Sequence, residues 1–219
     1  GSKLNFQGTS LDGAMDEVRI WNTGLTQAHI LDWMTRKLTP DHPAYNSLIR
    51  YYNFDETNIF KTIDSKGANT GALVNNVTAI TSGAAIGDAA VNNINNPLVW
   101  ATLPLSTGEN FSALQGAGTA AGLFVYVVKD PPENQTGIGG LGSNDHYFGV
   151  KKMEIPSGTT ASYSAEYNYT GNPFVSALTE PTLQLFKRID NSAATWSNSG
   201  AILNTTANTL TVTGQNTEY

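Results

Sequence analysis

The first residues to consider for chemistry are Asp16 and Glu17, adjacent carboxylates in the stretch DEVRIWN. Two carboxyl groups can cleave a glycosidic bond when they converge on one cleft, about 5–10 Å apart. Neighbouring side chains on a β-strand point to opposite faces, so this pair cannot line one cleft. Glu17 instead shares a face with Arg19. The sequence therefore predicts an ion pair between Glu17 and Arg19 and a structural role for both carboxylates.

The remaining candidates for catalysis or cofactor binding lack the spacing that these sites need. His29, His42 and His146 show neither metal-ligand nor triad spacing. The stretch GIGGLG (137–142) matches the dinucleotide pattern G-x-G-x-x-G, but that site needs a helix after the glycines. The strand-like HYFGV follows instead, so we predict a hairpin loop. We expect no catalytic residues and no enzymatic activity.

Calcium is the one ion for which the sequence offers candidate ligands. Ca²⁺ binds carboxylate, amide and carbonyl oxygens, often in glycine-containing turns. The stretch DETNIFKTIDSKGANTG supplies Asp55, Asp64 and Asn69. It has no complete calcium-loop signature, and the same side chains could instead bond their own backbone as Asx turns. Calcium is therefore the only candidate cofactor, and the Asx-turn alternative stays open.

The four tryptophans are the candidates for contact with a carbohydrate, because an exposed indole is a large amphipathic surface. Trp33 lies beside an apolar helical stripe and Trp100 in an apolar strand, so we expect both to be buried. Trp196, in ATWSNSG at the end of a strand, is the candidate carbohydrate-binding residue.

Composition excludes several classes of partner. The chain has 219 residues, a formal net charge of −6 and only 14% charged residues. Nucleic acids and anionic membrane surfaces need basic patches, so neither is an expected partner. The chain contains no cysteine, which excludes disulfides and thiolate sites. It contains no apolar run of about 18 residues, so we expect no membrane insertion.

The secondary structure that must position these residues differs before and after residue 80. Residues 14–22 alternate as a half-buried strand. Thr26 is then a candidate N-cap for a helix that ends before Pro40. The predicted buried stripe of this helix consists of Ile30, Leu31, Met34 and Leu38.

Strand signals dominate after residue 80. They include LVWATLPL, GLFVYVVKD, HYFGVKKMEI, ASYSAEYNYT and NTLTVTG, separated by Gly, Pro and Asn clusters. This spacing is typical of an antiparallel sandwich. GLFVYVVKD is apolar on both faces and should be a central strand. We predict a mostly β protein with two parts, a partial jellyroll with one short helix over 1–82 and an antiparallel β-sandwich over 83–219.

The order of motifs in the first part, GAMDEVRIWNTGLT, LIRYYNFDE and DSKGANTGAL, resembles the C-terminal end of a laminin-G-like, concanavalin-A-like jellyroll domain of bacterial surface proteins. The resemblance covers roughly residues 11–75. It implies that the front of the jellyroll lies outside this chain, and that the remainder of the parent protein or another polypeptide completes the domain. Jellyrolls of this kind often bind calcium.

Residues 83–219 resemble, more loosely, a β-sandwich module of large secreted Bacteroidetes proteins. The stretches that carry this resemblance are SGAAIGDAA, GIGGLGSNDHYFGV and the C-terminal LQLFKRIDNSAATWSNSGAILNTTANTLTVTG. Such proteins are often exported by the type IX route and serve as adhesins or in gliding motility. The resemblance implies an extracellular, cell-surface location.

Two functions remain open at this point. The first is a non-catalytic segment of a large secreted adhesin that provides display and spacing and can bind a glycan or another cell-surface ligand. The alternative is a carbohydrate-binding accessory segment of a secreted polysaccharide-degrading enzyme. Exposed aromatic side chains would favour the alternative.

Overall fold

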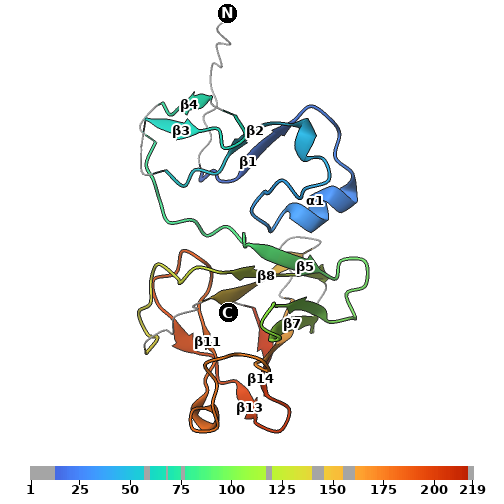
Figure 1. The fold of residues 1–219 in the computed structure, drawn as a ribbon, viewed down its shortest axis with the longest axis vertical. Helices are drawn as coiled ribbons and strands as arrows, with labels where there is room; N and C mark the ends of the chain where they lie inside the picture. The colour runs from blue at the N-terminus through green and yellow to red at the C-terminus, as the bar shows by residue number, and fades with distance from the viewer. Residues whose placement is uncertain are drawn as a thin grey trace, which may run out of the picture. The chain divides into compact units, whose positions relative to one another are not determined.

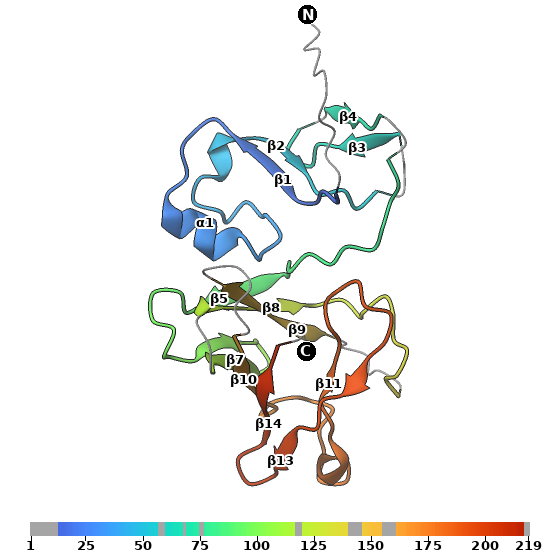
Figure 2. The same ribbon diagram turned by 180° about the vertical axis from the view of Figure 1, so that it is seen from behind.

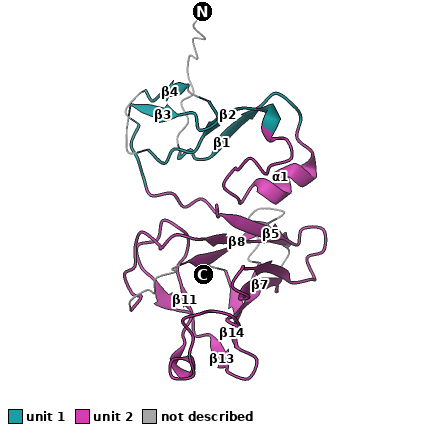
Figure 3. Ribbon diagram, viewed as in Figure 1, with its two compact units in different colours: residues 1–24, 46–80 teal, residues 25–45, 81–219 magenta. Residues whose placement is uncertain are grey.

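The computed structural model describes residues 13–56, 60–67, 69–74, 77–116, 120–139, 146–154 and 161–216. The chain divides into two compact units, which Figure 3 distinguishes by colour. The first unit is Gly1–Gly24 with Asn46–Ile80, and the second is Leu25–Tyr45 with Thr81–Tyr219. The sequence predicted one division at 82/83. The last boundary in the structure lies after residue 80, and residues 25–45 also belong to the second unit. We call residues 25–45 the strap.

Over its described residues, the first unit contains four short strands in two antiparallel pairs (Figure 1). They are β1 (Val18–Trp21), β2 (Leu48–Tyr52), β3 (Lys61–Ile63) and β4 (Thr70–Ala72). β1 pairs with β2, with Arg19 opposite Tyr51. β1 begins later than the alternation predicted, because Glu17 has a φ of 54°, which interrupts the extended backbone.

The second unit is an antiparallel β-sandwich, as predicted. Its five-stranded sheet has the order β13-β14-β10-β7-β6, and its three-stranded sheet has the order β5-β8-β9. Figure 2 shows β9 beside β8 and β10 beside β14. The strands are β5 (Ala89–Asn92), β6 (Ala101–Pro104), β7 (Asn110–Gln115), β8 (Ala120–Val128), β9 (Tyr147–Glu154), β10 (Tyr163–Asn168), β13 (Ile202–Asn204) and β14 (Thr209–Gln215). A separate pair is β11 (Phe186–Lys187) with β12 (Ser197–Asn198), and single 3₁₀ turns lie at Tyr45–Ser47 and Glu180–Thr182.

The core of the sandwich lies between its two sheets. Phe111 of β7 stacks on Phe148 of β9, with ring centroids 4.7 Å apart, and both rings are buried. Residues 123–127 of β8 are all at most 1% exposed, which confirms that GLFVYVVKD forms a central strand. Tyr126 of β8 is opposite Gly149 of β9. A Cβ at Gly149 would lie 2.0 Å from the Tyr126 ring, so only glycine leaves room for this buried side chain.

The strap is joined to the second unit through its backbone. The Gly87 N–H donates to the carbonyl of Thr35 at 3.0 Å, and the Lys37 N–H donates to the carbonyl of Gly87 at 2.8 Å. The Lys37 ammonium lies 3.0 Å from the Asp88 carboxylate. These contacts are the reason why the strap groups with the sandwich rather than with the strands before and after it.

The strap contains the helix α1 (Gln27–Trp33). The predicted N-cap is confirmed, because the Thr26 hydroxyl accepts a hydrogen bond from the His29 N–H at 3.2 Å. Among the described residues, no helix has the length and apolar character that are needed to cross a membrane.

The predicted buried face of the helix is wrong at two positions. Ile30 and Met34 are 50% and 40% exposed, whereas Trp33 and Leu38 are buried. The helix ends at Trp33, so the four-residue spacing that defined the stripe does not continue to Leu38. The Arg36 guanidinium lies over the Trp33 ring, 4.2 Å from its centroid, which covers the indole within the strap.

Candidate functional site

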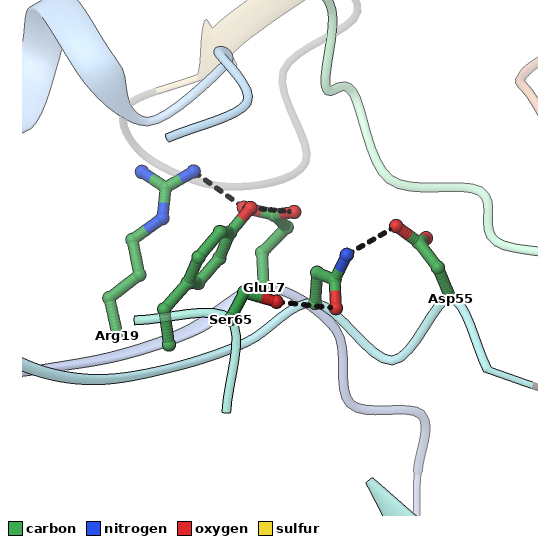
Figure 4. Close-up of polar contacts among 6 residues, drawn as sticks. Glu17, Arg19, Asp55 and Ser65 are labelled. Carbon is green, nitrogen blue, oxygen red and sulfur yellow. Dashed lines mark hydrogen bonds and ion pairs between the residues drawn. The ribbon is translucent and has the colours of Figure 1, made fainter. Parts of the chain in front are cut away.

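The first-unit carboxylate singled out by the sequence, Glu17, lies in a small polar network (Figure 4). The Arg19 guanidinium donates to Glu17 Oε2 at 2.6 Å, so the predicted ion pair is confirmed. The Tyr51 hydroxyl lies 2.6 and 2.8 Å from the two Glu17 oxygens. Both charged side chains are at most 15% exposed. Glu17 therefore links the start of β1 to β2 through its contacts with Arg19 and Tyr51.

Asp64, a predicted calcium ligand, is a buried acceptor for backbone donors. Its Oδ1 accepts from the N–H groups of Tyr51 and Lys66, both at 3.0 Å. Burial opposes ionisation of this carboxyl, but the backbone donors prevail and hold its pKa below the ordinary value. The Arg50 guanidinium nitrogen Nε lies 3.5 Å from Oδ2.

The other two predicted calcium ligands lie in different contacts. Asn69 accepts the Asp64 N–H through its backbone carbonyl at 2.8 Å, whereas the Asx turn here is the one that Asp64 Oδ1 closes with the Lys66 N–H. Asp55 is exposed and accepts from the Asn53 amide at 2.5 Å, and that amide oxygen accepts from Ser65 (Figure 4). The structure therefore brings Asp64 and Asn69 together but gives Asp55 a separate network.

These surroundings do not fit a calcium ion. Two backbone N–H groups donate to Asp64 Oδ1 and the Arg50 cation lies 3.5 Å from Oδ2, where Ca²⁺ would require further free oxygen ligands and no neighbouring cation. Among the described residues, no group of three or more His, Cys, Asp or Glu side chains is arranged to hold a metal ion.

Trp196, the candidate carbohydrate platform, is buried, so the expectation of an exposed ring is wrong. It is 6% exposed, and its indole N–H donates to the carbonyl of Asn134 at 2.9 Å. The Arg188 guanidinium lies 4.5 Å from its ring centroid and 4.7 Å from that of Tyr147. A cation over the indole face occupies the surface that a sugar would need. Trp196 therefore has a structural role: it connects the segment at Asn134 to Arg188.

The neighbouring glycine motif has a structural role in its described part. Gly137 has a φ of 94°, and a Cβ there would lie 2.2 Å from the Trp196 carbonyl oxygen. The backbone thus requires glycine for close approach to Trp196, which explains the start of GIGGLG without a phosphate. Residues 140–142 of the motif lie outside the described residues.

A buried polar cluster in the second unit was not found by sequence reasoning. Glu109 is 2% exposed and accepts from the Thr107 hydroxyl at 2.9 Å, the Asn172 amide at 3.0 Å and the Tyr167 hydroxyl. His146 Nε2 lies 3.8 Å from the same carboxylate. Burial and the Glu109 contact raise the pKa of Tyr167 well above its ordinary value. These residues are far apart in sequence, so no spacing pattern could have indicated the cluster.

No family model, curated protein or solved structure matches this chain.

Proposed function

We propose that this chain is a non-catalytic segment of a large secreted adhesin at a bacterial cell surface, where it provides spacing and displays a ligand-binding surface. The main support for this proposal is that the acidic side chains that could act in catalysis serve instead as acceptors of structural hydrogen bonds. Glu17, Asp64 and Glu109 each accept hydrogen bonds within their own unit. Carboxylates that hold loops in place suit a rigid display module, whereas glycosidases need two that converge on substrate.

Two further features support this proposal. Residues 11–75 resemble a laminin-G-like jellyroll of bacterial surface proteins, and residues 83–219 resemble a module of secreted Bacteroidetes proteins that often leave the cell by the type IX route, so both resemblances favour a surface protein. The first unit has four short strands in two pairs, and a two-stranded pair alone is marginally stable. The remainder of the parent protein, or another polypeptide, is its proposed partner.

Adhesion can be measured directly with microspheres that carry the full chain. We expect these spheres to be retained under flow on films of polysaccharide or mucin several-fold more strongly than spheres that carry the heat-denatured chain. No retention above that control on any film would contradict an adhesive role.

The enzymatic alternative needs a separate assay. The full chain is incubated with polysaccharides and peptides, and new reducing ends and amino groups are counted. We expect none above background. Turnover that disappears in Glu17→Gln or Glu109→Gln would replace the proposal with a hydrolase.

A further inference from the structure

The loop that joins β5 to β6 is held by one buried side chain, Asn93. Asn93 is 7% exposed, and its Oδ1 accepts the Leu123 N–H of β8 at 2.7 Å. Its Nδ2 donates to the carbonyls of Val99 at 2.6 Å and Pro97 at 3.5 Å. The amide therefore ties both ends of the loop to the central strand of the small sheet.

Backbone turns fix the loop between these ties. The Asn96 N–H donates to the Asn93 carbonyl at 2.8 Å, and the Val99 N–H donates to the Asn96 carbonyl at 3.0 Å. The two turns and the buried Asn93 amide hold the loop in one conformation in the absence of ligand. This order lowers the entropic cost of binding a ligand.

The fixed loop presents an aromatic side chain to solvent. Ala101, the first residue of β6, is 3% exposed and faces the core. Trp100 precedes it, so its side chain is directed away from the core, and it is 40% exposed. This is contrary to the sequence expectation that Trp100 is buried.

The loop that carries Trp100 has no charged residue, and it exposes the apolar Leu98 (83%) and Val99 (52%) as well as amides. No Asp, Glu, Lys or Arg occurs between Asp88 and Glu109. Asn95 and Asn96 are exposed in the same loop, and each amide offers two N–H donors and a carbonyl acceptor. An indole face suits the C–H face of a sugar ring, and amides suit its hydroxyls.

We infer that Asn95, Asn96 and Trp100 form a binding site for a neutral oligosaccharide. This inference deepens the proposed adhesive function and rests on it, and it places the sugar-contacting indole at Trp100 rather than Trp196. A neutral ligand is the class that fits, because the loop offers no charge to pair with an acidic sugar or an anionic lipid headgroup.

The test uses the full chain and immobilised neutral polysaccharides, namely β-glucan, xylan and mannan, with polygalacturonate as the charged comparison. We expect at least one neutral polymer to bind. Trp100→Ala should weaken that binding at least about tenfold, and Trp100→Phe, which keeps a ring, should weaken it less. Asn96→Ala should weaken it measurably, because one set of hydroxyl contacts is lost.

Phe174→Ala is the matched control, because Phe174 is an aromatic residue of the same unit with 49% exposure. We expect it to bind as the unaltered chain does. Ligand should also change the tryptophan fluorescence of the unaltered chain and not that of Trp100→Ala. Thermal melts of all variants check the fold.

Several outcomes would overturn the inference. They are a lack of binding to every neutral polymer, neutral-polymer binding that Trp100→Ala leaves intact, and loss of binding in Phe174→Ala equal to that in Trp100→Ala. Trp100-dependent retention on phosphatidylcholine vesicles without polysaccharide binding would identify a lipid-contacting loop instead. If spheres adhere to surfaces while the neutral polymers fail to bind, this inference fails and the adhesive function stands.

Discussion

Tyr51 contacts three parts of the first unit. Its hydroxyl bonds Glu17 at the start of β1, its N–H donates to Asp64, and its carbonyl accepts the Ser65 N–H at 2.7 Å. Glu17 reaches the hydroxyl from a backbone with positive φ, a conformation that costs about 1 kcal/mol or more for a residue other than glycine. The network must offset that cost, so its loss should be visible in stability.

At this residue scale, we expect Tyr51→Phe to lower the free energy of unfolding of the first unit by about 1–3 kcal/mol, because the partly buried Glu17 carboxylate loses a donor while the ring is kept. Chemical denaturation of the full chain, followed by amide exchange in β1 and β2, measures the change. Tyr52→Phe is the matched control, and an equal effect in both variants would contradict the role of the Tyr51 hydroxyl.

Asp64 gives the first unit an acid-sensitive contact. Its pKa in the folded chain lies below the ordinary value of 3.8. The stabilisation from ionised Asp64 is therefore complete above the ordinary value and is lost as pH falls through the lowered folded value. We expect Asp64→Asn to flatten the acid limb of the stability–pH curve and Asp55→Asn, at an exposed position, to leave it unchanged. An acid limb that Asp64→Asn does not alter would show that another group titrates there.

At the scale of the element, the start of helix α1 and its buried face have different causes. Local sequence determined where it begins, through the Thr26 cap. Which face is buried depends on tertiary contacts. The helix lies against β5, and Trp33 is buried under Arg36 and His42, while Met34 stays 40% exposed. A polar substitution at Met34 is therefore expected to be mild, although the sequence placed this residue in the buried stripe.

We expect Trp33→Ala to destabilise the second unit by about 3–5 kcal/mol, since a buried aromatic side chain leaves a cavity. Met34→Asp, at the next position, should change stability by less than about 1 kcal/mol. Thermal melts of the two variants provide the comparison. The reverse ranking would restore the stripe of Ile30 and Met34 as the buried face.

At the scale of the whole molecule, the chain passes between the units three times, after residues 24, 45 and 80. The strap leaves the first unit where Trp21 pairs with Leu48 and the Asn22 N–H bonds the Ser47 carbonyl at 2.9 Å. The second unit therefore includes the strap, residues 25–45, which lies between β1 and β2 of the first unit in the sequence.

This arrangement predicts the behaviour of the isolated fragment 83–219. Without the strap, Gly87 loses its bonds to Thr35 and Lys37, and Asp88 loses its lysine partner. We expect the fragment to fold but to show faster amide exchange at Gly87 and Asp88 and in β5 than the full chain does. A synthetic peptide of residues 25–45 should restore protection, and a peptide with Trp33→Ala should not. Equal protection in the fragment and the full chain would contradict the assignment of the strap.

The sequence by itself determined features that depend on short-range geometry. The Glu17–Arg19 pair follows from opposite charges two residues apart, the Thr26 cap began the helix, and apolar residues on both faces marked β8 as central, because such features depend on neighbours within a few residues. Only the tertiary structure decided which tryptophan is exposed, which face of α1 is buried, and that Glu109 meets Tyr167 and Asn172. Each of these depends on contacts between residues tens of positions apart, and burial is a property of the partner surface as much as of the residue itself.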